Sequence, residues 1–109
     1  TLATGDSQFH FFIPSDMANF DLVDADAANA TASTTGTPTI QLRNVTRALD
    51  MLSTKITIDT AEKTSFTAVI ASVIDTAVDS VASGDEIVVD IDSAGTAQGL
   101  NVILAFQKF

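Results

Sequence analysis

The chain has 109 residues, a length typical of one domain built around a single hydrophobic core. Its net charge of −9 repels phosphate backbones, which argues against nucleic-acid binding, and 46% hydrophobic residues argue against intrinsic disorder. The absence of cysteine excludes disulfides and thiolate metal sites, and no apolar run approaches the roughly 20 residues that span a membrane.

The first strand is expected over Gln8–Ile13, after a polar arm at Thr1–Ser7. Side chains alternate across a strand, so Phe9 and Phe11 share one face and Phe12 lies on the opposite face. Both faces of this strand are therefore partly apolar.

Three further strands are expected in the first half of the chain. Phe20–Thr31 alternates, but its phase slips, which predicts a bulge near Leu22–Val23 or a later strand start. Thr37–Thr46 and Lys55–Asp59 read as the next strands, because β-branched and apolar residues alternate with polar ones.

The segment Thr60–Gly84 is ambiguous. Its apolar residues recur with the spacing of an amphipathic helix, from Phe66 to Val81. Its many β-branched residues count against a helix. We expect strand-like pieces at Ser65–Ala68 and Ala71–Ile74 and a short helical turn at Ala77–Ala82.

The last two strands are expected at Glu86–Asp92 and Gly99–Phe106, where alternation is nearly strict. The small, turn-prone residues Ser93–Gln98 between them favour a β-hairpin that forms much of one wall of the core. Leu104 is expected to point into that core.

Six or more short strands separated by turns indicate an all-β fold, an antiparallel β-sandwich or jelly roll, with room for one short helix within residues 60–84. We divide the chain into an N-terminal arm with the first strand, residues 1–13, and a single β-sandwich domain, residues 14–109.

No catalytic motif stands out. His10 is the only histidine, so a triad or metal site has no second histidine or cysteine to draw on. Asp24 with Asp26, and Asp90 with Asp92, place carboxylates about 7 Å apart on one strand face, and we interpret them as solvated surface charges. We therefore expect no enzymatic activity, no metal and no cofactor.

The order of elements from Thr37 to Phe106 resembles a small β-domain found in structural proteins of tailed-bacteriophage virions. The matching stretches are Thr37–Asp59, Val73–Asp92 and Gly99–Phe106, about two-thirds of the chain, and NVTRALDMLST followed by ITID is the most specific part. The resemblance implies a structural role on the virion, with no catalytic residues to transfer.

We expect a capsid decoration (cement) protein on the outer head surface, where an acidic chain is better placed than in the DNA-filled interior. Its expected partners are the major capsid protein and copies of itself, as a homotrimer. The alternative is a glycan-binding or receptor-binding module of a phage fibre or adhesin, against which the lack of Trp and Tyr counts.

The candidate interface is the first strand, through Phe9, Phe11 and Phe12. A small sandwich has one interior, so one of the two aromatic faces needs cover from elsewhere. That cover is either a partner or the Thr1–Ser7 arm lying over Phe12.

Overall fold

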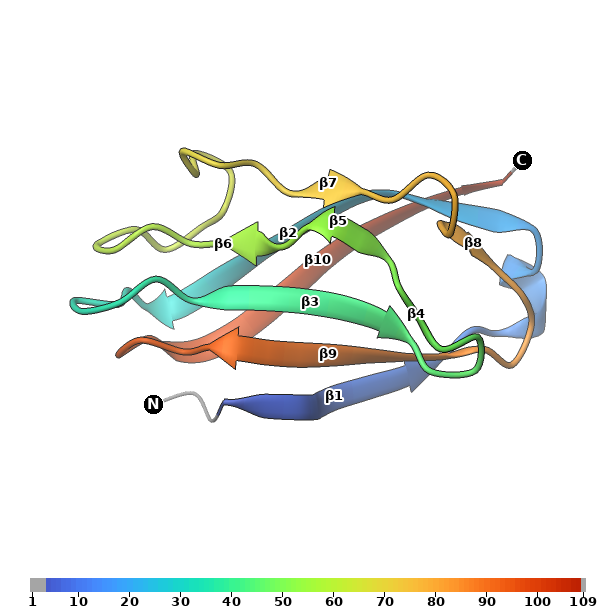
Figure 1. The fold of residues 1–109 in the computed structure, drawn as a ribbon, viewed down its shortest axis with the longest axis horizontal. Helices are drawn as coiled ribbons and strands as arrows, with labels where there is room; N and C mark the ends of the chain where they lie inside the picture. Colours follow the sequence, from blue (N-terminus) through green and yellow to red (C-terminus); the bar gives the residue numbers. More distant parts are fainter. Residues whose placement is uncertain (1–3, 109) are drawn as a thin grey trace.

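The chain forms two antiparallel sheets that face each other as a β-sandwich (Figure 1). The computed structural model describes residues 4–108, and for residues 6–8 the backbone alone. The molecule measures 39 × 23 × 20 Å. The all-β antiparallel fold expected from the sequence is confirmed. Residues 1–3 of the expected arm lie outside the described residues, and the first strand begins within it, at Gly5.

The larger sheet has the strand order β1-β9-β3-β4, with β6 also paired to β3. These strands are β1 (Gly5–Phe12), β9 (Glu86–Ser93), β3 (Thr39–Asn44), β4 (Leu49–Asp50) and β6 (Ile56–Thr57). All their pairings are antiparallel. Because β9 lies between β1 and β3, it is buried over most of its length, and β1 forms one edge of the sheet.

The smaller sheet has three strands in the order β10-β2-β8. They are β10 (Gln98–Lys108), β2 (Phe20–Thr31) and β8 (Ser80–Val81). The pairing of β10 with β2 skips Val23, since Ala105 lies opposite Asp24 and Phe106 lies opposite Leu22. The expected bulge near Leu22–Val23 is therefore confirmed, and β2 is the strand that carries the extra residue.

Residues 60–84 contain no helix. They contribute β7 (Val73–Ile74), which pairs with β5 (Leu52–Thr54) in a third sheet of two short strands. The short helical turn expected at Ala77–Ala82 is wrong: a hydrogen-bonded turn and β8 occupy that region. The strand expected at Ser65–Ala68 is also wrong, because those residues form a turn. Hydrogen bonds with β2 hold this segment in an extended path instead of a helix. The Ala27 N–H donates to Ser65 Oγ, and the Ser65 N–H donates to the Ala27 carbonyl, both at 2.9 Å.

The hairpin expected from the last two strands is also wrong. β9 belongs to the larger sheet and β10 to the smaller one, so the residues between them cross from one layer to the other. Gly95 makes the crossing with a φ of +56°, and a Cβ there would lie 2.4 Å from Ser33 Oγ. The Thr96 N–H donates to that same Ser33 Oγ at 3.0 Å, which ties the crossing to the preceding loop.

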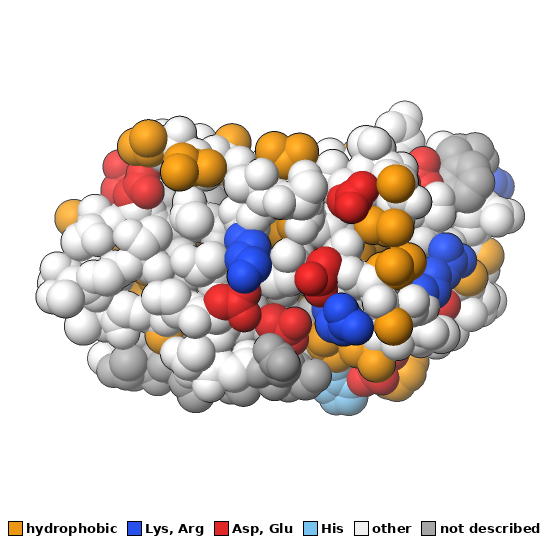
Figure 2. All heavy atoms as spheres, in the orientation of Figure 1, with side chains coloured by type: hydrophobic (Ala, Val, Ile, Leu, Met, Phe, Trp, Pro, Cys, Tyr) orange, Lys and Arg blue, Asp and Glu red, His pale blue; other side chains and the backbone are white. Residues whose placement is uncertain are grey.

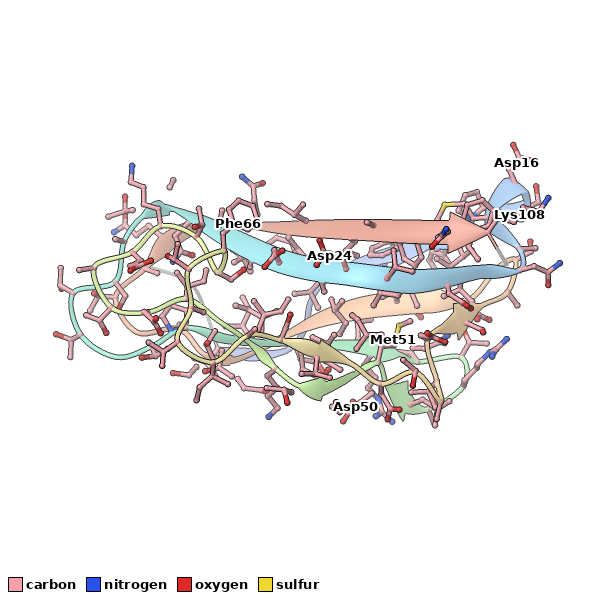
Figure 3. The ribbon with its side chains drawn as sticks, turned by 90° about the horizontal axis from the view of Figure 1, so that it is seen from above. Asp16, Asp24, Asp50, Met51, Phe66 and Lys108 are labelled. Carbon is pink, nitrogen blue, oxygen red and sulfur yellow. The ribbon has the colours of Figure 1, made fainter. Side chains whose placement is uncertain are left out.

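The core lies between the two sheets. Met51 points into this space while the neighbouring Asp50 points out of the larger sheet (Figure 3). The largest fully buried apolar side chains come from β2, β3, β6 and β9 and the segments beside them: Leu22, Ile40, Leu42, Met51, Ile56, Ile58, Ile87 and Ile91. Of the residues described, only Ser15–Met17 form a helix, a single 3-10 turn, so none could cross a membrane as a helix.

Candidate functional site

One side of the sandwich is open. β1 ends the larger sheet and β10 ends the smaller one, and an apolar groove of about 310 Å³ separates them. The groove is lined by Phe9, Phe11 and Val89 from the larger sheet and by Leu100, Val102, Leu104 and one polar residue, Asn101, from the smaller one. None of the side chains that the structure describes along the groove is charged.

The core is incompletely covered at this side. Leu104 faces inward on β10 as expected, yet it is only half-buried, as are Val102 and Phe106. By contrast, Ile40 and Leu42 on the central strand β3 are fully buried. The inward-facing side chains of β10 are therefore less completely covered than those of β3.

The structure separates the three aromatic residues of the candidate interface. Phe9 and Phe11 line the groove, with Phe9 still 49% exposed. Phe12 lies on the opposite face of β1 and is 59% exposed. It packs edge-on against His10, with ring centroids 6.0 Å apart, and His10 Nδ1 lies 3.1 Å from Glu86 Oε2. The pale blue histidine marks this cluster at the lower border of Figure 2.

A second apolar surface was missed by sequence reasoning. Four large hydrophobic side chains after β6 are exposed, the last of them at the start of β7: Phe66, Val69, Ile70 and Val73. Val69 is 89% exposed, and Phe66 lies outside the space between the layers (Figure 3). These residues form half of the apolar stripe that has helical spacing. The β-branched residues of the stripe were the available signal that the segment is not a helix.

The outer face of the larger sheet carries a polar hollow of about 430 Å³, visible as neighbouring red and blue side chains in Figure 2. Arg43 pairs with Asp50 at 3.1 Å, and Lys55 pairs with Asp92 at 2.7 Å. The hydrogen bond to the Asp92 carboxylate, followed by its charge, raises the pKa of Lys55. Both cations in the hollow are thus held by carboxylates.

The predicted carboxylate pairs differ in their surroundings. Asp24 is exposed, and Asp26 accepts a hydrogen bond from the Ser65 hydroxyl at 2.7 Å. Asp90 is only 6% exposed, so its interpretation as a solvated charge is wrong. The residue lies on β9, which has β1 on one edge and β3 on the other. Among residues 4–108 with described side chains, no three His, Asp or Glu residues come together as a group that could hold a metal ion.

Asp85, the residue before β9, is buried. Its Oδ2 accepts from the Ala82 N–H at 2.9 Å and from Asn44 Nδ2 at 3.0 Å. Arg47 Nε lies 3.3 Å from the same oxygen. This carboxylate therefore joins the turn before β9 to the end of β3.

Comparison of the chain with protein-family models, with curated proteins and with solved structures gave no match. The resemblance to phage virion domains therefore stays an expectation of the sequence, and the geometry of the open side carries the functional argument.

Proposed function

We propose that the chain is a structural protein of a phage virion, a decoration subunit on the outer surface of the capsid. It binds the major capsid protein and copies of itself through apolar surfaces at the open side of the sandwich. The observation that carries this proposal is the uncharged groove between β1 and β10, flanked by the exposed Phe9 and, on the outer face of β1, by Phe12. Exposed aromatic residues beside an open core are typical of interface centres.

The charge of the chain supports the external placement. A net charge of −9 opposes contact with packaged DNA, whereas the groove and Phe12 offer uncharged contact surfaces. The described side chains form clusters that explain stability, such as the one around Asp85.

The second candidate is a glycan-binding module, and the polar hollow on the larger sheet favours it. Arg43 and Asp50 there offer the guanidinium and carboxylate groups that hydrogen-bond sugar hydroxyls. Against it, the hollow contains no aromatic platform and Arg43 already pairs with Asp50.

The test is binding of the purified protein to capsids that lack it. Phe12→Ser and Phe9→Ser remove exposed rings, so each folded variant should bind about tenfold more weakly or worse, because burying a Phe contributes about 1.5–3 kcal/mol. Phe66→Ser is the matched control, since Phe66 is similarly exposed (63%) and lies between β6 and β7, in a segment that is hydrogen-bonded to β2.

Wild-type affinity for capsids in both Phe variants would overturn the proposed contact. Retention of the protein on host polysaccharide, lost in Arg43→Ala and unaffected by Phe12→Ser, would favour the glycan-binding module instead.

A further inference from the structure

The free edge of β10 is the longest unpaired strand edge in the part of the chain that the structure describes. β10 has 11 residues, all within its pairing with β2 on one side, and no strand on the other. An exposed edge offers a row of backbone N–H and C=O groups to another chain, and monomeric proteins block such edges with charges, prolines or bulges. β10 contains no proline, and Lys108 at its end is its only charge.

The composition of β10 contrasts with that of its neighbours. The adjacent strand β2 carries Asp21, Asp24 and Asp26, and β9 carries Glu86, Asp90 and Asp92. In a chain of net charge −9, two copies repel each other over most of their surface. The edge of β10 is a place where two copies can meet without bringing carboxylates together.

We propose that β10 pairs antiparallel with β10 of a second copy about a two-fold axis, which joins two three-stranded sheets into one of six strands. The two-fold axis of such a pair must pass through a residue, so that inward-facing residues of one copy lie opposite inward-facing residues of the other. A shift of the pairing by one residue would place inward-facing side chains opposite outward-facing ones. The midpoint of Gln98–Lys108 is Ile103, an outward-facing residue that is 45% exposed.

Centring the pair on Ile103 gives a compatible partner at each position. Ile103 meets Ile103 and Asn101 meets Ala105 on the outer face, while Val102 meets Leu104 on the inner face. Lys108 lies opposite Gln98, so no like charges face each other. The bulge does not interrupt this ladder, because the extra residue, Val23, belongs to β2.

The pairing also accounts for the partial burial along β10. A second strand beside the free edge extends the smaller sheet past the groove and covers the half-buried Val102 and Leu104. The inference specifies how copies meet in the proposed function, but it does not need the capsid. It predicts an even number of copies, and so departs from the trimer expected from the sequence.

The decisive experiment uses the absence of cysteine in the chain. In Ile103→Cys the two thiols of a dimer lie directly opposite each other, within the Cα separation that a disulfide requires. In the matched variant Asn101→Cys the two thiols are four residues out of register, about 13 Å apart. Mild oxidation should link the Ile103→Cys protein into a dimer and leave Asn101→Cys unlinked.

Sedimentation velocity of the unmodified protein supplies the second measurement. Wild type should sediment as a dimer, and Ile103→Lys, which places two ammonium groups across the two-fold axis, should raise the dissociation constant about tenfold or more. Val45→Lys, an exposed residue outside β10, should leave it unchanged.

A monomeric or trimeric wild type, or equal crosslinking of the two cysteine variants, would overturn the pairing. Dimers that form through Ile103 yet fail to bind capsids would leave the pairing intact and contradict the proposed capsid role alone.

Discussion

At the scale of single residues, the alternation of apolar and polar residues in the sequence predicted the face on which a side chain lies, but not how deeply that side chain is buried. Phe9 and Phe11 share one face and Leu104 faces inward, as their phase predicts, yet all three line an open groove. Leu42 has the same inward orientation on β3 and is fully buried. The difference is the position of the strand: β3 has partners on both edges, whereas β1 and β10 each end a sheet.

This difference predicts unequal costs for the same truncation. Leu42→Ala should lower the free energy of unfolding by about 2–5 kcal/mol, because it leaves an enclosed cavity. Leu104→Ala should cost clearly less, because the groove already admits water at that side chain. Urea denaturation of the two variants at low protein concentration measures both values. Equal losses would mean that the groove is closed in solution.

At the scale of elements, the segment between β6 and β8 shows how edge hydrogen bonds outweigh a helical pattern. The bonds between Ser65 and Ala27 attach this segment to the free edge of β2. Ser72 Oγ adds a bond of 2.8 Å to the Ala25 carbonyl. With the chain extended along β2, only part of the apolar stripe reaches the core: Val81 is buried, whereas Val69 is exposed.

Two serine substitutions distinguish this arrangement from a helix. Val69→Ser should change the free energy of unfolding by less than about 0.5 kcal/mol, since its side chain is exposed. Val81→Ser should cost about 2 kcal/mol or more, because it removes buried methyl groups and buries a hydroxyl. Thermal unfolding with calorimetry measures both. An amphipathic helix would have buried both residues on one face, so similar losses would contradict the extended path.

At the scale of the whole molecule, charge and apolar surface are distributed unevenly. The described carboxylates lie mainly on β2, on β9 and in the loops, and among the described side chains the groove and β10 carry none. Association of two such molecules combines a favourable apolar contact with repulsion between two charges of −9. Salt should therefore strengthen this association, the reverse of what is expected for an interface built on ion pairs.

Raising the ionic strength from about 0.01 M to 0.1 M shortens the screening length from about 30 Å to 10 Å, which weakens the repulsion between copies. The dissociation constant of the wild-type dimer should fall about threefold or more over this range, as followed by sedimentation equilibrium. A dissociation constant that rises with salt would point to an ionic contact in place of the β10 edge.

The sequence by itself determined the all-β class, the bulge at Leu22–Val23 and the inward phase of Leu100–Phe106, because these follow from local alternation with a period of two. Only the tertiary structure decided which strands pair. The same alternation in β9 and β10 suits a hairpin or two facing sheets, and the crossing at Gly95 selects the second. The open side depends on strand order across both sheets, a long-range property, so the groove and the free edge of β10 appear only in the folded molecule.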